Sequence, residues 1–242
     1  MYFYQDPQIL IDEMLEAGKS VMMVPHRFSE RKKHLASKVG TYCVEFNCFK
    51  NDEEGLEVLN HWHNKCLECC SNLGDGVHWG DQKYMDEWPM LFPNNVHVCN
   101  NLGAGVTTWN IDHYKLVKRE GPIVQYKPYN CTGNIVFYHF AAIKNITHSL
   151  YKINIREGFD SIDYGMVDFL YFIYLKKIKA ARDILESKYH ITILQPKNKP
   201  IINYAKIIII LFLQTRVGVF IRKISASFIQ TFKHYPHLIN IE

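Results

Sequence analysis

Two groups of polar residues are spaced in a way that suits chemistry on a phosphorylated substrate. Asp81 and Gln82 follow Gly80 in the stretch GDQKYMDEWP (80–89), and His139 lies near the end of an apolar run, with Lys144 five residues later. A histidine at a strand end can bind a divalent metal ion, and a nearby lysine can neutralise a diphosphate leaving group. A carboxylate–amide pair can hydrogen-bond sugar hydroxyls and flank an anomeric carbon.

Each of these features also has a structural interpretation. A strand-end histidine can be a packed residue, and Asp81 can simply cap a short helix. The stretch HWHNKCLECC (61–70) gathers two histidines and three cysteines, but all of them fall on one expected helix, whereas structural zinc takes ligand pairs from separate elements. The helical spacing of Cys66 and Cys69 favours small residues packed on a core over a zinc site.

The elements that must position these residues alternate between strand and helix. Strands are expected at residues 20–24, 41–49, 96–99 and 135–140, and helices at 8–18, 52–71, 81–88 and from 163 onward. Asn51 or Asp52 should cap the second helix, and Pro89 should end the third. This alternation predicts an α/β fold. Residues 195–200 (QPKNKP) indicate a linker to a further helical segment.

Composition and charge limit the function classes. Residues 1–143 carry 13 lysines and arginines against 17 acidic residues, whereas residues 144–242 carry 15 against 7. The basic aliphatic segment 201–242 suits a helix at a membrane surface, or a helix packed on the domain or in a dimer. Its apolar run at 207–213 is too short to span a bilayer. Nucleic-acid binding is disfavoured because no recognised motif accompanies the basic residues. Seven cysteines without a disulfide pattern, and no signal-peptide start, predict a cytoplasmic protein.

Five stretches in sequence order resemble one protein family: PHRFS (25–29), GTYCVEFNCFKNDEEGLEVL (40–59), GDQKYMDEWP (80–89), NLGAGVTTWNI (101–111) and FYHFAAIK (137–144). They resemble a bacterial branch of glycosyltransferases with the GT-A fold, distantly similar to glycogenin and to lipopolysaccharide galactosyltransferases. The similarity covers roughly residues 1–185, and GDQKYMDEWP is its most specific motif. It implies a partial GT-A mixed sheet with flanking helices over residues 1–150, a helical region at 151–195 that completes the domain, and a basic helical extension at 196–242.

The resemblance also implies a function and a site. The expected reaction is transfer of a sugar, with retention of configuration, from a nucleotide-sugar donor to a hydroxyl of a cell-envelope glycan or glycolipid, by an enzyme peripheral to the inner face of the cytoplasmic membrane. Asp81 and Gln82 would contact the donor sugar, His139 would help to bind Mn²⁺ or Mg²⁺, and Lys144 would approach the diphosphate. The remaining expected substrate-binding residues are His26, Arg27, Cys43, Glu45, Gly80, Gly103, Trp109 and Asn110.

Several departures from the family pattern favour an alternative. Cys43-Val44-Glu45 replaces an Asn-x-Gly, Ala142 replaces a glycine, and Leu102 and Thr108 stand where the family tends to have prolines. The first residues resemble the stretch that follows the family's Asp-x-Asp motif, so the two metal-binding carboxylates and the nucleotide-binding half would lie before residue 1. The sequence therefore also supports a truncated enzyme, or an inactive remnant or sugar-binding module of the same family.

Overall fold

The computed structural model describes residues 1–71, 77–145, 149–153, 155, 162–191 and 237–241. The described residues belong to two compact units. The first comprises Met1–His139 with Ile162 and Asp163, and the second comprises the described parts of Phe140–Gly158 and Tyr164–Glu242. Both helices and several small sheets are present, so the expected α/β class is confirmed at that level.

The central sheet of the first unit has three strands in the order β3–β2–β4, namely β3 (Tyr42–Phe49), β2 (Val21–Pro25) and β4 (Val96–Val98). β2 is antiparallel to β3 and parallel to β4. All four apolar residues that open β2 are fully buried. This explains the continuous apolar run Val21–Val24, because a strand that is covered on both faces has no polar face to present.

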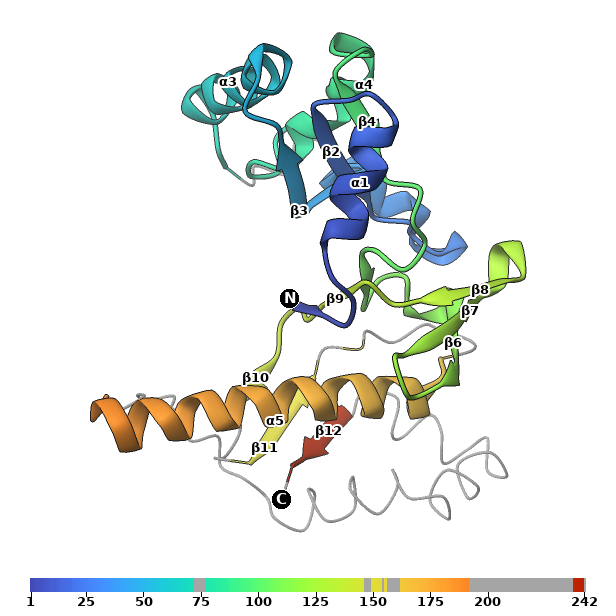
Figure 1. The fold of residues 1–242 in the computed structure, drawn as a ribbon, viewed down its shortest axis with the longest axis vertical. Coiled ribbons are helices and arrows are strands. Elements are labelled where there is room, and N and C mark those ends of the chain that lie inside the picture. The colour runs from blue at the N-terminus through green and yellow to red at the C-terminus, as the bar shows by residue number, and fades with distance from the viewer. Residues whose placement is uncertain (72–76, 146–148, 154, 156–161, 192–236, 242) are drawn as a thin grey trace. The chain divides into compact units, whose positions relative to one another are not determined.

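Helices cover the two faces of this sheet (Figure 1). On one face, Met22 and Val24 pack with Leu10 and Met14 of α1 (Gln8–Glu16). On the other face, the helical core residues are Val58 of α3 (Glu53–Glu68), Met85 of the 3₁₀ helix η2 (Lys83–Glu87) and Trp88 of α4 (Trp88–Leu91). The even and odd residues of β2 therefore point to separate cores, as a two-residue period requires.

Two further sheets of the first unit contain the remaining strands. One has the order β1–β9–β5, formed by β1 (Tyr2–Phe3), β9 (Phe137–His139) and β5 (Val106–Thr107). The other is an antiparallel meander of β6 (Tyr114–Lys118), β7 (Ile123–Tyr126) and β8 (Cys131–Asn134). The shorter connecting elements are η1 (Glu30–Leu35), α2 (Ala36–Val39), η3 (Ile111–His113) and η4 (Lys127–Tyr129).

The second unit contains one long helix, α5 (Tyr164–Tyr189), and a sheet in the order β10–β11–β12. Its strands are β10 (Lys144–Asn145), β11 (Leu150–Ile153) and β12 (His237–Asn240), and both pairings are antiparallel. Phe140 stacks on Tyr174 of α5, with 4.0 Å between the ring centroids. Within the described residues, no helix combines the length and the apolar character needed to cross a bilayer.

Most expected elements are confirmed, and their ends differ by a few residues. Asp52 caps α3, its carboxylate accepting a hydrogen bond from the Gly55 backbone amide at 2.9 Å. The helix expected at 81–88 is wrong in detail, because η2 begins at Lys83, Asp81 is not its cap and α4 continues through Pro89. A proline in the first helical turn removes no hydrogen bond, so Pro89 does not end this segment. The expected linker at 195–200 and nearly all of the expected extension at 196–242 lie outside the described residues.

Candidate functional site

An irregularity in β3 directs Glu45 toward the interior. Met23 of β2 pairs with Asn47, whereas the next residue, Val24, pairs with Cys43. The three residues Val44–Phe46 therefore have no counterpart on β2. A bulge of this kind bends the strand and changes where a side chain points. Glu45 lies within this irregular stretch and is buried, like Cys43 two residues before it.

The carboxylate of Glu45 is closed off from solvent and lies beside His139. Oε2 of Glu45 is 3.8 Å from Nδ1 of His139, and neither carboxylate oxygen receives an N–H or O–H hydrogen bond from the described residues. Removal from water disfavours the charged form of a carboxylate. Burial accordingly raises the pKa of Glu45 to about 8, although the positive charge of Arg27 opposes the shift. Burial also lowers the pKa of His139.

His26 and Trp109 extend this cluster on the other side of His139. The ring centroid of Trp109 is 5.5 Å from His139 and 5.3 Å from His26. Asn110 is fully buried and holds the segment in place, because its amide donates to the carbonyl oxygens of His26 and Gly105, both at 2.9 Å. Burial lowers the pKa of His26 to about 4, so its imidazole is neutral at physiological pH.

Cys43 connects the cluster to the Asp81 segment. Burial raises the pKa of the Cys43 thiol, and the nearby negative charges of Glu45 and Asp81 raise it further. Trp62 fixes the backbone at Asp81, donating from its indole N–H to the Asp81 carbonyl at 2.8 Å. The Asp81 carboxylate itself has no hydrogen bond with any described residue.

Gln82 differs from Asp81 in this respect. Its Nε2 donates to the Val39 carbonyl at 2.7 Å, and its Oε1 accepts from the Val44 amide at 3.4 Å. These bonds tie η2 to α2 and to the bulged part of β3. The expected sugar contact by Gln82 stays a prediction, but the amide already has structural partners on both of its atoms.

Arg27 adopts a left-handed backbone conformation, with φ at 46°. This conformation is uncommon for a residue with a side chain. Its guanidinium donates to the carbonyl oxygens of Ala104 at 2.6 Å, Cys99 at 2.8 Å and Asn101 at 3.1 Å. Arg27 thus anchors the segment after β4, while the preceding residue, His26, turns its ring into the buried cluster.

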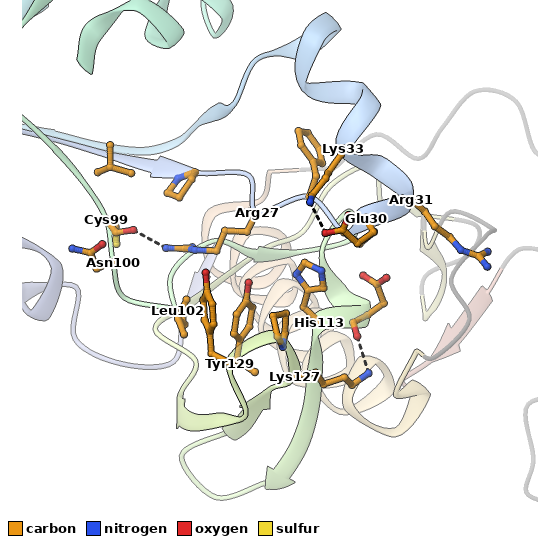
Figure 2. Close-up of a pocket in the computed structure, with 17 residues that line it drawn as sticks. Arg27, Glu30, Arg31, Lys33, Cys99, Asn100, Leu102, His113, Lys127 and Tyr129 are labelled. Carbon is orange, nitrogen blue, oxygen red and sulfur yellow. Dashed lines mark hydrogen bonds and ion pairs between the residues drawn. The ribbon is translucent and has the colours of Figure 1, made fainter. Parts of the chain in front are cut away.

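Arg27 also lines a cavity of about 930 Å³ (Figure 2). Its walls are formed by residues between Pro25 and Lys33, residues between Val98 and Leu102, part of η3, and the end of β7 with η4. The chemically notable lining residues are Arg27, Phe28, Lys33, Asn100, His113, Tyr126, Lys127 and Tyr129. Only Arg27 among them was expected as a site residue, because the others are separated in sequence and form no recognisable motif.

The other expected residues have clear positions. Gly80 takes a left-handed conformation with φ at 56° immediately before Asp81. Gly103 packs against backbone, because a Cβ on it would come within 1.9 Å of the Asn134 carbonyl oxygen. Lys144 lies in β10 of the second unit, so its expected approach to a diphosphate beside His139 stays a prediction.

The described residues do not form a complete site for Mn²⁺ or Mg²⁺. Among them no group of three or more histidine, cysteine, aspartate or glutamate side chains is placed to hold a metal ion. Glu45 and His139 supply one carboxylate and one imidazole, whereas these hard cations prefer several oxygen ligands. In the stretch expected either to pack or to bind zinc, His61 instead contacts Glu87 at 2.8 Å.

The chain is similar to two proteins of Bacillus subtilis (strain 168). It is 27% identical to "Uncharacterized protein YfnD" over 191 aligned residues, and the aligned region covers 78% of this chain and 58% of that protein. It is 28% identical to "Uncharacterized protein YfnF" over 153 aligned residues, and the aligned region covers 61% of this chain and 48% of that protein. The chain thus spans about half the length of the curated relatives it matches. No protein-family model and no solved structure matches it.

Proposed function

We propose that this chain provides the sugar-binding part of a glycosyltransferase that uses a nucleotide-sugar donor and a glycan or glycolipid acceptor. The observation that supports the proposal is the convergence of residues from five segments. Cys43 and Glu45 come from one stretch of the family resemblance, and His26, Asp81, Trp109 and His139 come from the four others, yet all of them are neighbours in one cluster. The partial GT-A fold remains part of this proposal.

Within the proposed enzyme, we assign the roles of the side chains by whether their polar atoms have hydrogen-bond partners among the described residues. The Asp81 carboxylate would accept hydrogen bonds from donor-sugar hydroxyls and hold the anomeric carbon in position. Trp109 offers an aromatic face beside the neutral imidazoles of His26 and His139. Gln82 would act mainly by holding η2 against β3, because its amide atoms bond Val39 and Val44.

A second candidate is a catalytically inactive remnant or sugar-binding module of the same family. The position of Glu45 favours it. Its carboxylate fills the space beside His139 and reaches Gly105 so closely that a Cβ there would lie 2.6 Å from Oε1. A side chain in this position reduces the room for a sugar.

Calorimetric titration with UDP-glucose, UDP-galactose and UDP-N-acetylglucosamine in the presence of Mn²⁺ tests the proposal. We expect one donor to bind with a dissociation constant near micromolar, or about −8 kcal/mol. Release of UDP from the bound donor would identify the enzyme. Binding without release or transfer would identify the binding module, and an absence of heat with all three donors would contradict the enzyme and support an inactive remnant.

A further inference from the structure

The cavity in Figure 2 lies where ligands commonly bind to α/β proteins. β2 and β4 are parallel, so their carboxyl ends, at Pro25 and Val98, meet at one edge of the sheet. Crevices outside the carboxyl ends of parallel strands are frequent binding sites. Both strand ends line this cavity, and its volume of about 930 Å³ is large enough for a ligand of one to several rings.

One wall of the cavity is aromatic. Tyr126 and Tyr129 lie side by side, with 5.5 Å between their ring centroids, and Tyr129 is 73% exposed. Phe28 also lines the cavity and stacks on the His26 ring with a centroid distance of 4.5 Å. Aromatic rings offer flat apolar faces, and a tyrosine adds a polar hydroxyl. An exposed ring in a concave site suits the apolar face of a sugar ring.

The charge of the lining is predominantly positive. The lining includes four cationic residues, Arg27, Arg31, Lys33 and Lys127, and two carboxylates, Glu30 and Asp112. Figure 2 shows Lys33 and Lys127 on opposite sides of the cavity, with Arg27 and His113 between them and Arg31 turned outward. Lys33 pairs with Glu30, and Lys127 donates to the Asp112 carbonyl at 2.7 Å. A concave surface with excess positive charge attracts anionic ligands.

We infer that this cavity binds a saccharide that carries an anionic group, such as a phosphate or a carboxylate. The sugar would pack on Tyr129, and the anionic group would lie near Lys127. The binding of this saccharide is independent of the proposed function. Its role as the acceptor of the sugar transfer rests on the proposed function. Arg27 makes the connection reasonable, since it lines the cavity while the adjacent His26 belongs to the buried cluster.

The lining favours a sugar over a nucleotide base. The lining also includes the side-chain amide of Asn100 and the hydroxyl groups of Tyr126 and Tyr129. A polyol has hydroxyls on all sides and can use such a distribution. A planar base has polar atoms only on its edge and gains most between parallel rings, but the rings of Tyr126 and Tyr129 are inclined by 43°.

The test is a titration of the ¹⁵N-labelled full chain, followed by amide chemical shifts. The probes are glucose 6-phosphate, glucose, inorganic phosphate and UMP. We expect glucose 6-phosphate to shift amides at 27–33, 99–102 and 126–130, and to bind at least about tenfold more tightly than glucose, because one charged contact is worth roughly that factor. Its affinity should fall as salt is added.

Two variants and two matched controls locate the site. Tyr129→Ala and Lys127→Gln should each weaken binding of glucose 6-phosphate about fivefold or more. Tyr189→Ala changes a tyrosine with 56% exposure on α5, and Lys118→Gln changes an exposed lysine of the same meander that does not line the cavity. Both controls should leave the affinity unchanged. Near-UV circular dichroism checks that each variant is folded.

Three results would overturn the inference: equal affinity for glucose and glucose 6-phosphate, an unchanged affinity in both cavity variants, or tighter binding of UMP with the same amide shifts. The proposed function is tested separately, by the titrations with UDP-sugars. Binding of glucose 6-phosphate without binding of any UDP-sugar would keep the cavity as a saccharide site and contradict the glycosyltransferase.

Discussion

Nδ1 of His139 lies 3.8 Å from Oε2 of Glu45, whose side chain is entirely shielded from water. The bulge in β3 creates this proximity by directing Glu45 inward between Cys43 and Asn47. Because burial also lowers the pKa of His139, the imidazole is not a fixed positive partner for the carboxylate. The pair is therefore best described as a neutral acid beside a neutral imidazole over much of the physiological range.

This relationship predicts a stability that falls between pH 6.5 and pH 8. Burial raises the pKa of Glu45 from 4.5 to about 8, so in this interval the folded chain keeps a proton that the unfolded chain has released. Folding stability then decreases as the pH rises. The lowered pKa values of His26, His113 and His139 oppose this fall, because unfolded imidazoles are still partly protonated at pH 6.5, and each offsets it by about 0.4 kcal/mol or less. Glu45 alone should lower the unfolding free energy in urea by about 1–2 kcal/mol between pH 6.5 and pH 8, and this contribution is read as the difference between the wild type and Glu45→Gln.

Two substitutions isolate the contribution of Glu45. Glu45→Gln keeps the shape and removes the titration, so its unfolding free energy should no longer fall over the same interval. Glu120→Gln changes a carboxylate that is 90% exposed, and it should retain the wild-type slope. An equal slope in Glu45→Gln would show that another group causes the pH dependence.

The close approach of Glu45 to Gly105 gives a second prediction. Gly105 has φ at 74°, and a Cβ on it would lie 2.6 Å from Glu45 Oε1 and 2.7 Å from Val24 Cγ1. Gly105→Ala should lower the unfolding free energy by about 2–4 kcal/mol, combining backbone strain with overpacking. Gly121 also has positive φ, at 55°, but open space around it, so Gly121→Ala should cost only about 1 kcal/mol. Equal losses in urea unfolding would mean that the crowding at Gly105 is unimportant.

The three carbonyl contacts of Arg27 give a third prediction. Arg27→Lys keeps the charge but cannot reproduce a planar fork that reaches Cys99, Asn101 and Ala104. The unfolding free energy should fall by about 2–3 kcal/mol, because carbonyl groups are left without donors. The exposed Arg119 offers the control, since Arg119→Lys should change stability by less than about 0.5 kcal/mol. Thermal unfolding of both variants provides the measurement.

The order and type of the main elements in the first unit could be predicted from the sequence, because buried runs such as Val21–Val24 and the Asp52 cap have local signals. The resemblance also names most members of the His26–His139 cluster, because each of them lies in one of the five stretches that carry it. The bulge that aims Glu45 inward could not be predicted, since it depends on how β3 pairs with β2. The aromatic wall of the cavity was missed for a similar reason. Tyr126 and Tyr129 line the same cavity as Phe28 only because the tertiary fold brings these separate segments together.

The contrast between Asp81 and Gln82 separates structural from functional roles in the motif GDQKYMDEWP. Gln82→Ala removes the partners of the Val39 carbonyl and the Val44 amide, so it should destabilise the chain by about 1–2 kcal/mol. Asp81→Asn removes a carboxylate that has no hydrogen bond with the described residues, so it should change the unfolding free energy by less than about 0.5 kcal/mol. Calorimetric titration with the UDP-sugar that the wild type binds should show the opposite order, with at least about a tenfold loss of affinity in Asp81→Asn, equivalent to about 1.4 kcal/mol. If Asp81→Asn instead lowers stability as much as Gln82→Ala and leaves donor affinity unchanged, the carboxylate is a structural group and the proposed sugar contact is wrong.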